Sequence, residues 1–173
     1  MKRVECTLER HGAAILAILN EAILNSTALY EYRPRAPESM AGWFAAKSAG
    51  RYPVIGLEDA AGELLGFASY GAFRPHAAYK YSVEHSVYVR ADRRGQGIGR
   101  QLLQAVVDAA VAQGYHLLVG GIDATNRASI ALHERLGFSH AGTIRQAGFK
   151  FGRWLDLAFY QLHLPTPKNP TDG

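Results

Sequence analysis

Cysteine is almost absent from this chain of 173 residues. The single Cys6 excludes a disulfide framework and a zinc site built from cysteines. The seven histidines never form a His-Glu-x-x-His pattern, so we expect no metal cofactor.

Long hydrophobic runs and clustered charges are missing as well. No apolar stretch approaches the ~20 residues that a membrane-spanning helix needs, and the first residues lack a basic-then-apolar signal pattern. We therefore expect a cytoplasmic protein without a membrane partner. The net charge is +4, but Lys and Arg are scattered along the chain, which argues against a nucleic-acid partner.

The hydrophobic and turn patterns predict an α/β chain with a mixed sheet, most simply one domain with a real core. Strands are expected at 2–7, at 53–58 and 63–70 as a hairpin joined by the turn 59–62, at 82–89 and at 117–122. A last pair of strands is expected to begin at Phe138, with 148–152 between the two strands. Helices are expected at 12–24, 37–47, 100–112 and 126–136. The helices should bury Ile15, Leu19, Ala22 and Ile23, and then Leu102, Leu103, Val106, Val107 and Ala110. We predict a domain over 1–164 and a flexible, proline-rich tail over 165–173.

The stretch Arg93-Arg94-Gly95-Gln96-Gly97-Ile98-Gly99 lies between a predicted strand and a predicted helix. Glycines let consecutive backbone N–H groups converge on one anion, and the positive end of the following helix dipole points to the same place. The arginines add positive charge. The pattern predicts a phosphate-binding loop.

The residues after this loop restrict which phosphate ligand it binds. Arg100-Gln101 follow Gly99, so the Lys-Ser/Thr pair of a nucleoside-triphosphate loop is missing, and the third glycine of a dinucleotide fingerprint would fall at Arg100. The remaining form, Q/R-x-x-G-x-G/A, resembles the loop of the GNAT superfamily of N-acetyltransferases. This resemblance implies acetyl-CoA as cosubstrate, bound by Val87, Tyr88, Val89, Arg94, Gly95, Gln96, Gly97, Ile98 and Gly99. The order of predicted elements is that of the GNAT fold.

A second block, from Asn126 to Phe138, resembles the GNAT pattern N-x-x-A/S-x-x-L-Y-x-x-x-G-F. The resemblance implies that Asn126 and Ser129 face the pantetheine arm, although Asn126 also fits a helix N-cap. His133 replaces the family's tyrosine, which protonates the departing thiolate. An imidazolium can serve as that donor, but His133 also fits a core position, and the thiolate can leave unprotonated.

Three further blocks, 71–75, 81–89 and 148–156, resemble the phosphinothricin and methionine sulfoximine acetyltransferases, over about 10–164. This implies acetylation of the α-amine of a small amino-acid analogue, of the methionine sulfoximine, methionine sulfone or phosphinothricin type, and hence resistance to such herbicides or antimetabolites. Relatives in this group are dimers. We expect a homodimer in which the loop at 148–154 reaches the neighbouring subunit.

Within this resemblance Glu84 is the expected general base, because it starts the strand that leads to the loop and an ammonium must lose a proton before it attacks a thioester. Arg74 is suited to pair with the acceptor's carboxylate. The remaining pocket walls are expected from Phe73, Tyr30, Tyr79 and Tyr81. Glu84 and Arg74 also fit a solvated surface. The transfer would be direct, without an acyl-enzyme.

Two other functions are compatible with these patterns. The same fold could acetylate a protein N-terminus or another small amine, or the chain could bind coenzyme A without catalysis. A polyamine acceptor needs acidic clusters, whereas the expected pocket is aromatic and carries arginines. The presence of Glu84 and His133 argues against a non-catalytic module.

Overall fold

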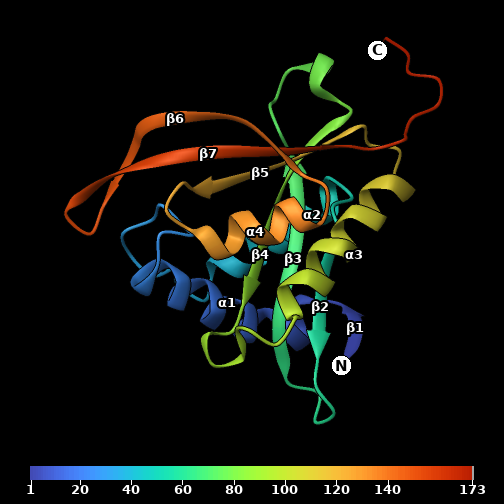
Figure 1. Ribbon diagram of the computed structural model, residues 1–173. Helices are drawn as coiled ribbons and strands as arrows, with labels where there is room; N and C mark the ends of the chain where they lie inside the picture. The colour runs from blue at the N-terminus through green and yellow to red at the C-terminus, as the bar shows by residue number, and fades with distance from the viewer. Residues whose placement is uncertain (173) are drawn as a thin grey trace. The chain divides into compact units, whose positions relative to one another are not determined.

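The computed structural model describes residues 1–172 (Figure 1). The contacts among these residues form two compact units. The first unit consists of Met1–Tyr70 and Ser86–Val106, and the second of Gly71–His85 together with the chain from Val107 onward. The predicted domain over 1–164 therefore stays a prediction. The last residue of the predicted tail, Gly173, lies outside the described residues.

The first unit opens with a three-stranded antiparallel arrangement and two helices. Its elements are β1 (Lys2–Glu5), α1 (Leu8–Asn25), α2 (Ser39–Ala49), β2 (Val54–Glu58) and β3 (Leu64–Ala72), whose last residues belong to the second unit. Strand β2 pairs with both β1 and β3. The turn between β2 and β3 is built by Asp59, whose Oδ1 accepts hydrogen bonds from the N–H groups of Ala61 and Glu63. The predicted hairpin is confirmed.

Helix α1 begins at Leu8, earlier than predicted, because Thr7 caps it: Oγ1 of Thr7 accepts a hydrogen bond from the N–H of Arg10 at 3.3 Å. The apolar face predicted for this helix is confirmed as buried. It joins a core cluster of Cys6, Ile15, Ile18, Leu19, Met40, Val54, Leu64 and Phe67. The first unit thus has its own hydrophobic core.

Strand β4 (Ser82–Val89) and helix α3 (Ile98–Ala112) each run through both units, and the short helix η2 (Ala91–Arg93) lies between them. Four of the five predicted core residues of α3 are buried. Val107 is only half-buried, and Ala105 is buried instead. The buried face of α3 is therefore turned slightly about the helix axis from the face that the pattern predicted.

The second unit contains η1 (Ala77–Tyr79), β5 (Leu117–Asp123), α4 (Arg127–Arg135), β6 (Ser139–Lys150) and β7 (Arg153–His163). Its strand order is β4-β5-β7-β6, with β4 and β5 parallel and the other pairs antiparallel. The predicted mixed α/β fold and the order of its strands and α-helices are confirmed.

Strands β6 and β7 run side by side as a long hairpin (Figure 1). The segment at 148–152 was predicted to lie between the strands, but β6 continues to Lys150. A shorter turn suffices because Phe151 and Gly152 both adopt positive φ, 52° and 72°, as a two-residue hairpin turn requires.

Candidate functional site

The predicted phosphate loop forms an open turn in the first unit, just before α3. Gly95 and Gly97 have φ of +79° and +78°, in the left-handed region that favours glycine. A Cβ at either position would meet no atom within 4 Å, so the backbone conformation, and not lack of space, calls for glycine here. The side chain of Ile98 is buried, which anchors the first turn of the helix.

The N–H groups of this first turn are suited to an anion. The N–H of Gln101 donates to the carbonyl of Gly97 at 3.2 Å. The N–H groups that come before it in the first turn, those of Ile98 to Arg100, have no carbonyl acceptor inside the helix. Together with the helix dipole they favour a negatively charged ligand. Nη2 of Arg94 lies 2.7 Å from Oε2 of Glu21, so its charge is already paired with α1.

In the second unit, Glu84 and His85 are adjacent on β4 and therefore point to opposite faces of the sheet. Glu84 is half-buried. A Cβ added to Gly121 of β5 would lie 3.2 Å from Oε1 of Glu84, so this glycine leaves room for the carboxylate. Burial raises the pKa of Glu84, and the positive charge of Arg74 opposes the rise. A raised pKa makes a carboxylate a better base.

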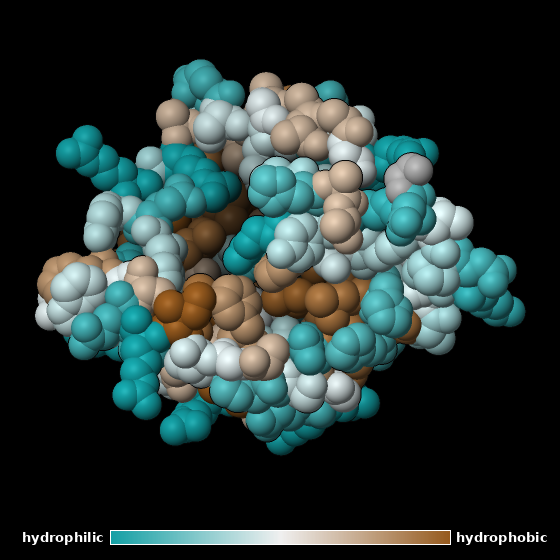
Figure 2. Space-filling model, turned by 90° about the horizontal axis from the view of Figure 1, so that it is seen from above, coloured by the Kyte–Doolittle hydropathy of each residue, from teal (hydrophilic) through white to brown (hydrophobic). Residues whose placement is uncertain are grey.

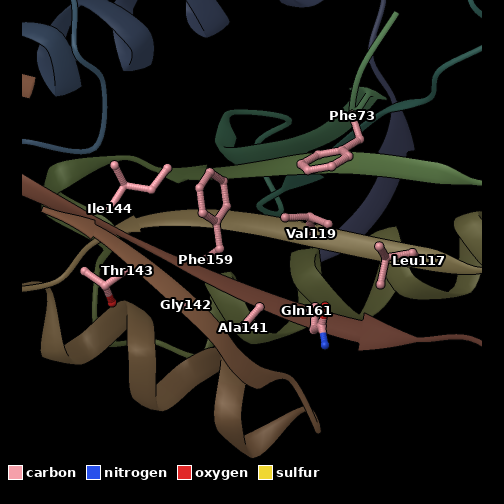
Figure 3. Close-up of a pocket in the computed structure, with 9 residues that line it drawn as sticks. All are labelled: Phe73, Leu117, Val119, Ala141, Gly142, Thr143, Ile144, Phe159 and Gln161. Carbon is pink, nitrogen blue, oxygen red and sulfur yellow. The ribbon is translucent and has the colours of Figure 1, made fainter. Parts of the chain in front are cut away.

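A cavity of about 460 Å³ opens on the same side of the sheet as Glu84 (Figure 3). Glu84 pairs with Val119, which lines the cavity, and Gly121 on the same face pairs with Phe159. Figure 3 shows Phe159 between Ile144 and Val119. The lining is mainly apolar and comprises Phe73, Leu117, Val119, Ala141, Gly142, Thr143, Ile144, Phe159 and Gln161.

Most of these lining residues escaped prediction from the sequence. The alternation Leu117, Val119, Gly121 on β5 was a usable signal, because such residues share one face of a strand. The partner residues Phe159 and Gln161 depend on the register between β5 and β7, which the sequence does not specify. The structure adds a concave apolar surface beside the predicted base.

The predicted substrate residues are distributed unevenly. Phe73 lines the cavity, and the guanidinium of Arg74 lies 4.3 Å from its ring centroid. Tyr79 packs edge-on against Phe73 at 5.8 Å. Tyr81 instead bonds to the C-terminal segment, since its Oη accepts a hydrogen bond from the N–H of Thr171 at 3.1 Å. Tyr30 is exposed and belongs to the first unit.

His133 is buried on the face opposite Glu84. Its Nδ1 lies 2.7 Å from the carbonyl oxygen of Ser129, and its Nε2 lies 2.9 Å from Nε2 of His85. Burial, followed by the neighbouring His133, lowers the pKa of His85 to about 3, and burial also lowers the pKa of His133. Both rings are therefore neutral near pH 7. Asn126 caps α4, because its Oδ1 accepts a hydrogen bond from the N–H of Ser129.

Residues 1–172 contain no group of three or more His, Cys, Asp or Glu side chains placed to hold a metal ion. No helix in this range combines the length and apolar character that crossing a membrane requires.

The chain is similar to known acetyl-transferring proteins. The model of the "Acetyltransferase (GNAT) family" matches residues 17–138. An L-methionine sulfoximine/L-methionine sulfone acetyltransferase of Pseudomonas paraeruginosa is 52% identical over 157 residues, 90% of this chain and 91% of that protein.

Two solved structures extend the similarity to the fold. An N-acetyltransferase from Staphylococcus aureus Mu50 has a TM-score of 0.91 and 48% identity, covering 94% of this chain and 97% of that one. A phosphinothricin acetyltransferase from Sinorhizobium meliloti, solved in complex with AcCoA, has a TM-score of 0.93 and 34% identity, covering 99% and 92%.

Proposed function

Since this chain belongs to the acetyltransferase (GNAT) family, we propose that it transfers the acetyl group of acetyl-CoA directly to the α-amine of methionine sulfoximine or methionine sulfone, with phosphinothricin as a related acceptor. The names and identities of the relatives support this acceptor class. The observation that carries the proposal is a half-buried carboxylate, Glu84, beside an apolar cavity of about 460 Å³.

We propose that acetyl-CoA is bound by the residues that the sequence motifs predict. The N–H groups around Arg94–Gly99 hold the diphosphate, and the positive φ of Gly95 and Gly97 supports this assignment. Val87, Tyr88 and Val89 of β4 contribute backbone groups, and Asn126 and Ser129 contact the pantetheine arm. When bound, acetyl-CoA supplies the thioester carbonyl. Because Arg94 is paired with Glu21, a diphosphate competes with that carboxylate for the guanidinium.

For the acceptor we propose that the cavity holds the side chain and Arg74 the carboxylate. Phe73, Val119 and Phe159 offer apolar contacts to methylene groups, and Gln161 and Thr143 offer hydrogen bonds to sulfur-bound oxygen or nitrogen. Tyr79 supports Phe73. Tyr30 and Tyr81 stay predicted wall residues.

In the reaction, Glu84 removes the proton of the acceptor's ammonium group, directly or through a water molecule. The free amine then attacks the thioester carbonyl, and an N–H of β4 near Val87 stabilises the developing negative charge on oxygen. His133 stays the proposed source of the proton for the thiolate. Because burial lowers its pKa, the ring must first take up a proton to form the imidazolium that donates. Unassisted departure of the thiolate is the alternative.

We also propose that the chain forms a homodimer through the β6–β7 hairpin. At its tip Phe149, Phe151 and Trp154 are 46%, 57% and 58% exposed, which is unusual for large apolar side chains unless a partner covers them. Figure 2 shows that hydrophobic surface is exposed between hydrophilic side chains on the face of the molecule seen from above. The cytoplasmic location and a role in resistance to amino-acid analogues remain predictions.

Release of free thiol from acetyl-CoA tests the function. Methionine sulfoximine, methionine sulfone and phosphinothricin should each stimulate release, whereas a polyamine and a peptide with a free N-terminus should not. Thiol release stimulated only by the peptide or only by the polyamine would contradict the proposed acceptor class and identify that amine as the acceptor instead. Binding of acetyl-CoA without turnover of any amine would favour a non-catalytic module.

A further inference from the structure

Strand β6 contributes four consecutive residues, 141–144, to the wall of the cavity. A regular strand presents only alternate residues to one face of a sheet. The exception coincides with a bulge, because the pairing of β6 with β7 shifts between His140 and Gly142 and leaves Ala141 as an extra residue. Bulges of this kind redirect side chains and are frequent next to functional sites.

A second, larger bulge begins directly after the cavity wall. The pairing is interrupted between Ile144 and Gly148, where residues 145–147 of β6 lie opposite the single residue Asp156 of β7. Gln146, in the middle of this bulge, has φ of +53°, in the left-handed region that is unfavourable for a residue with a Cβ. The bulge therefore needs a contact that holds it in this conformation.

Asp156 supplies such a contact. Its Oδ1 accepts a hydrogen bond from the N–H of Gln146 at 2.8 Å. The backbone of Asp156 is itself fixed, because its carbonyl accepts a hydrogen bond at 2.9 Å from the N–H of Ala124, directly after β5. The preceding residue, Leu155, is fully buried. The bulge that follows Ile144 is thus tied through β7 to β5.

Ile144 and Glu84 lie toward opposite ends of the cavity. Glu84 of β4 and Phe159 of β7 flank Gly121 of β5, since a Cβ there would lie 3.2 Å from Oε1 of Glu84 and 3.8 Å from Cε1 of Phe159. Ile144 follows on β6, and Figure 3 shows it beside Phe159. Because neighbouring strands lie about 4.8 Å apart, β4 and β6 are separated by about 14 Å. An acceptor that lies along the cavity with its amine at Glu84 therefore has the end of its side chain near Ile144.

The side chain of Ile144 is suited to an apolar group at this end. Ile144 is 52% exposed although it is large and apolar, and it borders a mainly apolar cavity. A ligand that fills the cavity would cover it. Methionine sulfoximine, methionine sulfone and phosphinothricin all end in a methyl group on a tetrahedral sulfur or phosphorus atom. This methyl group matches an isoleucine side chain, which makes apolar contacts only.

We propose that Ile144 determines which acceptors fit, through contact with their terminal methyl group, and that Asp156 is a positioning residue that holds Ile144 in place through the bulge at 145–147. This inference rests on the proposed function, because it refines how the cavity selects the acceptor. A longer side chain collides with Ile144, whereas a shorter one loses contact with it.

Ethionine sulfone, which carries an ethyl group in place of the methyl group, measures this selection. The wild type should prefer methionine sulfone, since one methylene in an apolar pocket changes kcat/KM by about 10- to 200-fold. We expect the kcat/KM ratio of ethionine sulfone to methionine sulfone to rise by about tenfold in Ile144→Ala and by less in Ile144→Val. The KM for acetyl-CoA should change little. An unchanged ratio in Ile144→Ala would overturn the proposal.

Substitutions in the second bulge test the role of Asp156. Asp156→Asn keeps an oxygen that accepts the hydrogen bond of Gln146 and should keep the wild-type ratio. Asp156→Ala lacks this acceptor, so the ratio should rise by about threefold, as expected for the loss of one hydrogen bond. The matched control is Gln146→Gly, which keeps the N–H and favours a positive φ, and should leave the ratio unchanged. A wild-type ratio in Asp156→Ala would remove Asp156 as the positioning residue.

Amide hydrogen exchange, measured by NMR on the full chain, tests the bulge without any turnover. The N–H of Gln146 should exchange faster in Asp156→Ala than in the wild type or in Asp156→Asn. Equal exchange in the three chains would contradict the role of Asp156. A wild-type chain that acetylates neither sulfone would contradict the proposed function. Acetylation of methionine sulfone with the same ratio in the wild type and in Ile144→Ala would contradict this inference alone.

Discussion

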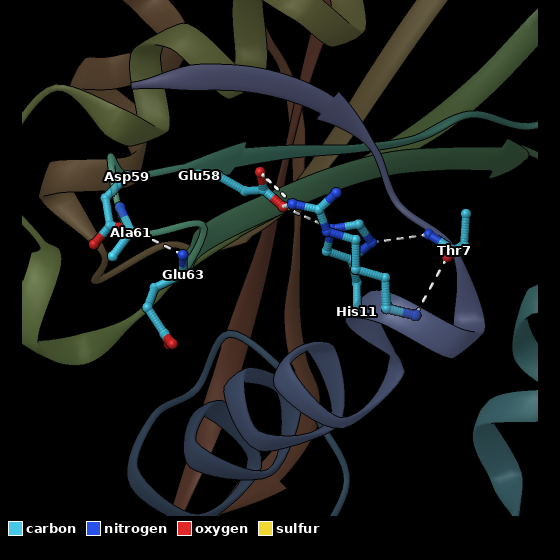
Figure 4. A network of polar contacts seen from close by, with 7 residues as sticks. Thr7, His11, Glu58, Asp59, Ala61 and Glu63 are labelled. Atoms are coloured by element: carbon cyan, nitrogen blue, oxygen red, sulfur yellow. Dashed lines mark hydrogen bonds and ion pairs between the residues drawn. The ribbon is translucent and has the colours of Figure 1, made fainter.

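Nε2 of His11 lies 3.0 Å from Oε1 of Glu58, and both side chains are buried in the first unit (Figure 4). The N–H of Thr7 donates to Nδ1 of His11, so the ring's proton is on Nε2 and points to the carboxylate. Nη2 of Arg10 lies 2.8 Å from the same oxygen. This network joins the start of α1 to the end of β2.

Replacing His11 by Phe should destabilise the protein, because the N–H of Thr7 loses its acceptor, at about 1–3 kcal/mol for a buried group left unsatisfied, and Glu58 keeps only Arg10 as a partner. Thermal unfolding measures the change, with Glu9→Ala as an exposed control on the same helix. The hydrogen bond from His11, and then Arg10, lowers the pKa of Glu58. Its contribution to stability is therefore present above the ordinary pKa of a glutamate, near 4.5, and is lost as the pH falls through the lowered value. A melting temperature unaffected by His11→Phe would contradict this role.

Glu84→Gln should lower kcat by about 10²- to 10⁴-fold, the usual contribution of a general base, with little change in acetyl-CoA affinity. The amide keeps the size of the side chain but cannot accept the ammonium proton. Steady-state kinetics and calorimetry measure the two effects. Because the base must be ionised, wild-type kcat/KM should fall as the pH drops through the raised pKa of Glu84, and the variant should lack this limb. A variant with wild-type kcat would remove Glu84 as the base.

Arg74→Ala should raise the KM for the acceptor by about tenfold, the effect of losing a charge-assisted pair worth about 1.4 kcal/mol. It should also shift the acidic limb of the pH profile upward, because Arg74 now lowers the pKa of Glu84. Lys168 is exposed, so Lys168→Ala is the control for the loss of one positive charge. Unchanged KM and an unshifted profile would together exclude contact between Arg74 and the acceptor's carboxylate.

Much of the fold follows from local patterns. The alternation around Glu84, the apolar face of α1 and the glycines near 95–97 are properties of short segments, and the structure has the corresponding elements at these places. The pairing of His133 with His85 joins residues from α4 and β4, and the lining of the cavity depends on the register of β5 with β7. Such long-range relationships have no local signal, so the sequence identified His133 but not its partner.

Gly121→Ala tests whether the proposed general base, Glu84, depends on the missing side chain at Gly121 of β5 for its position. The new Cβ would lie 3.2 Å from Oε1 of Glu84 and 3.3 Å from Cδ1 of Leu157, so the carboxylate must shift by a few tenths of an ångström. We expect kcat to fall by about tenfold, because proton transfer depends on hydrogen-bond distance. Gly42→Ala is the control: its Cβ meets nothing within 4 Å in α2, and alanine favours the helix by about 1 kcal/mol. Full activity of Gly121→Ala would show that the carboxylate of Glu84 can shift without loss of proton transfer, and would contradict this prediction.

Gly97→Ala tests the phosphate loop, and Gly114→Ala provides a matched control. Both glycines have positive φ, +78° and +77°, and a Cβ at either meets nothing within 4 Å, so each substitution should cost about 1–2 kcal/mol through the backbone alone. Only Gly97 lies in the loop before α3, where a change in φ redirects the N–H groups of the first turn. We therefore expect similar losses in thermal stability, but acetyl-CoA affinity reduced by about tenfold only in Gly97→Ala. Equal acetyl-CoA affinities in the two variants, measured by calorimetry, would mean that the diphosphate binds elsewhere.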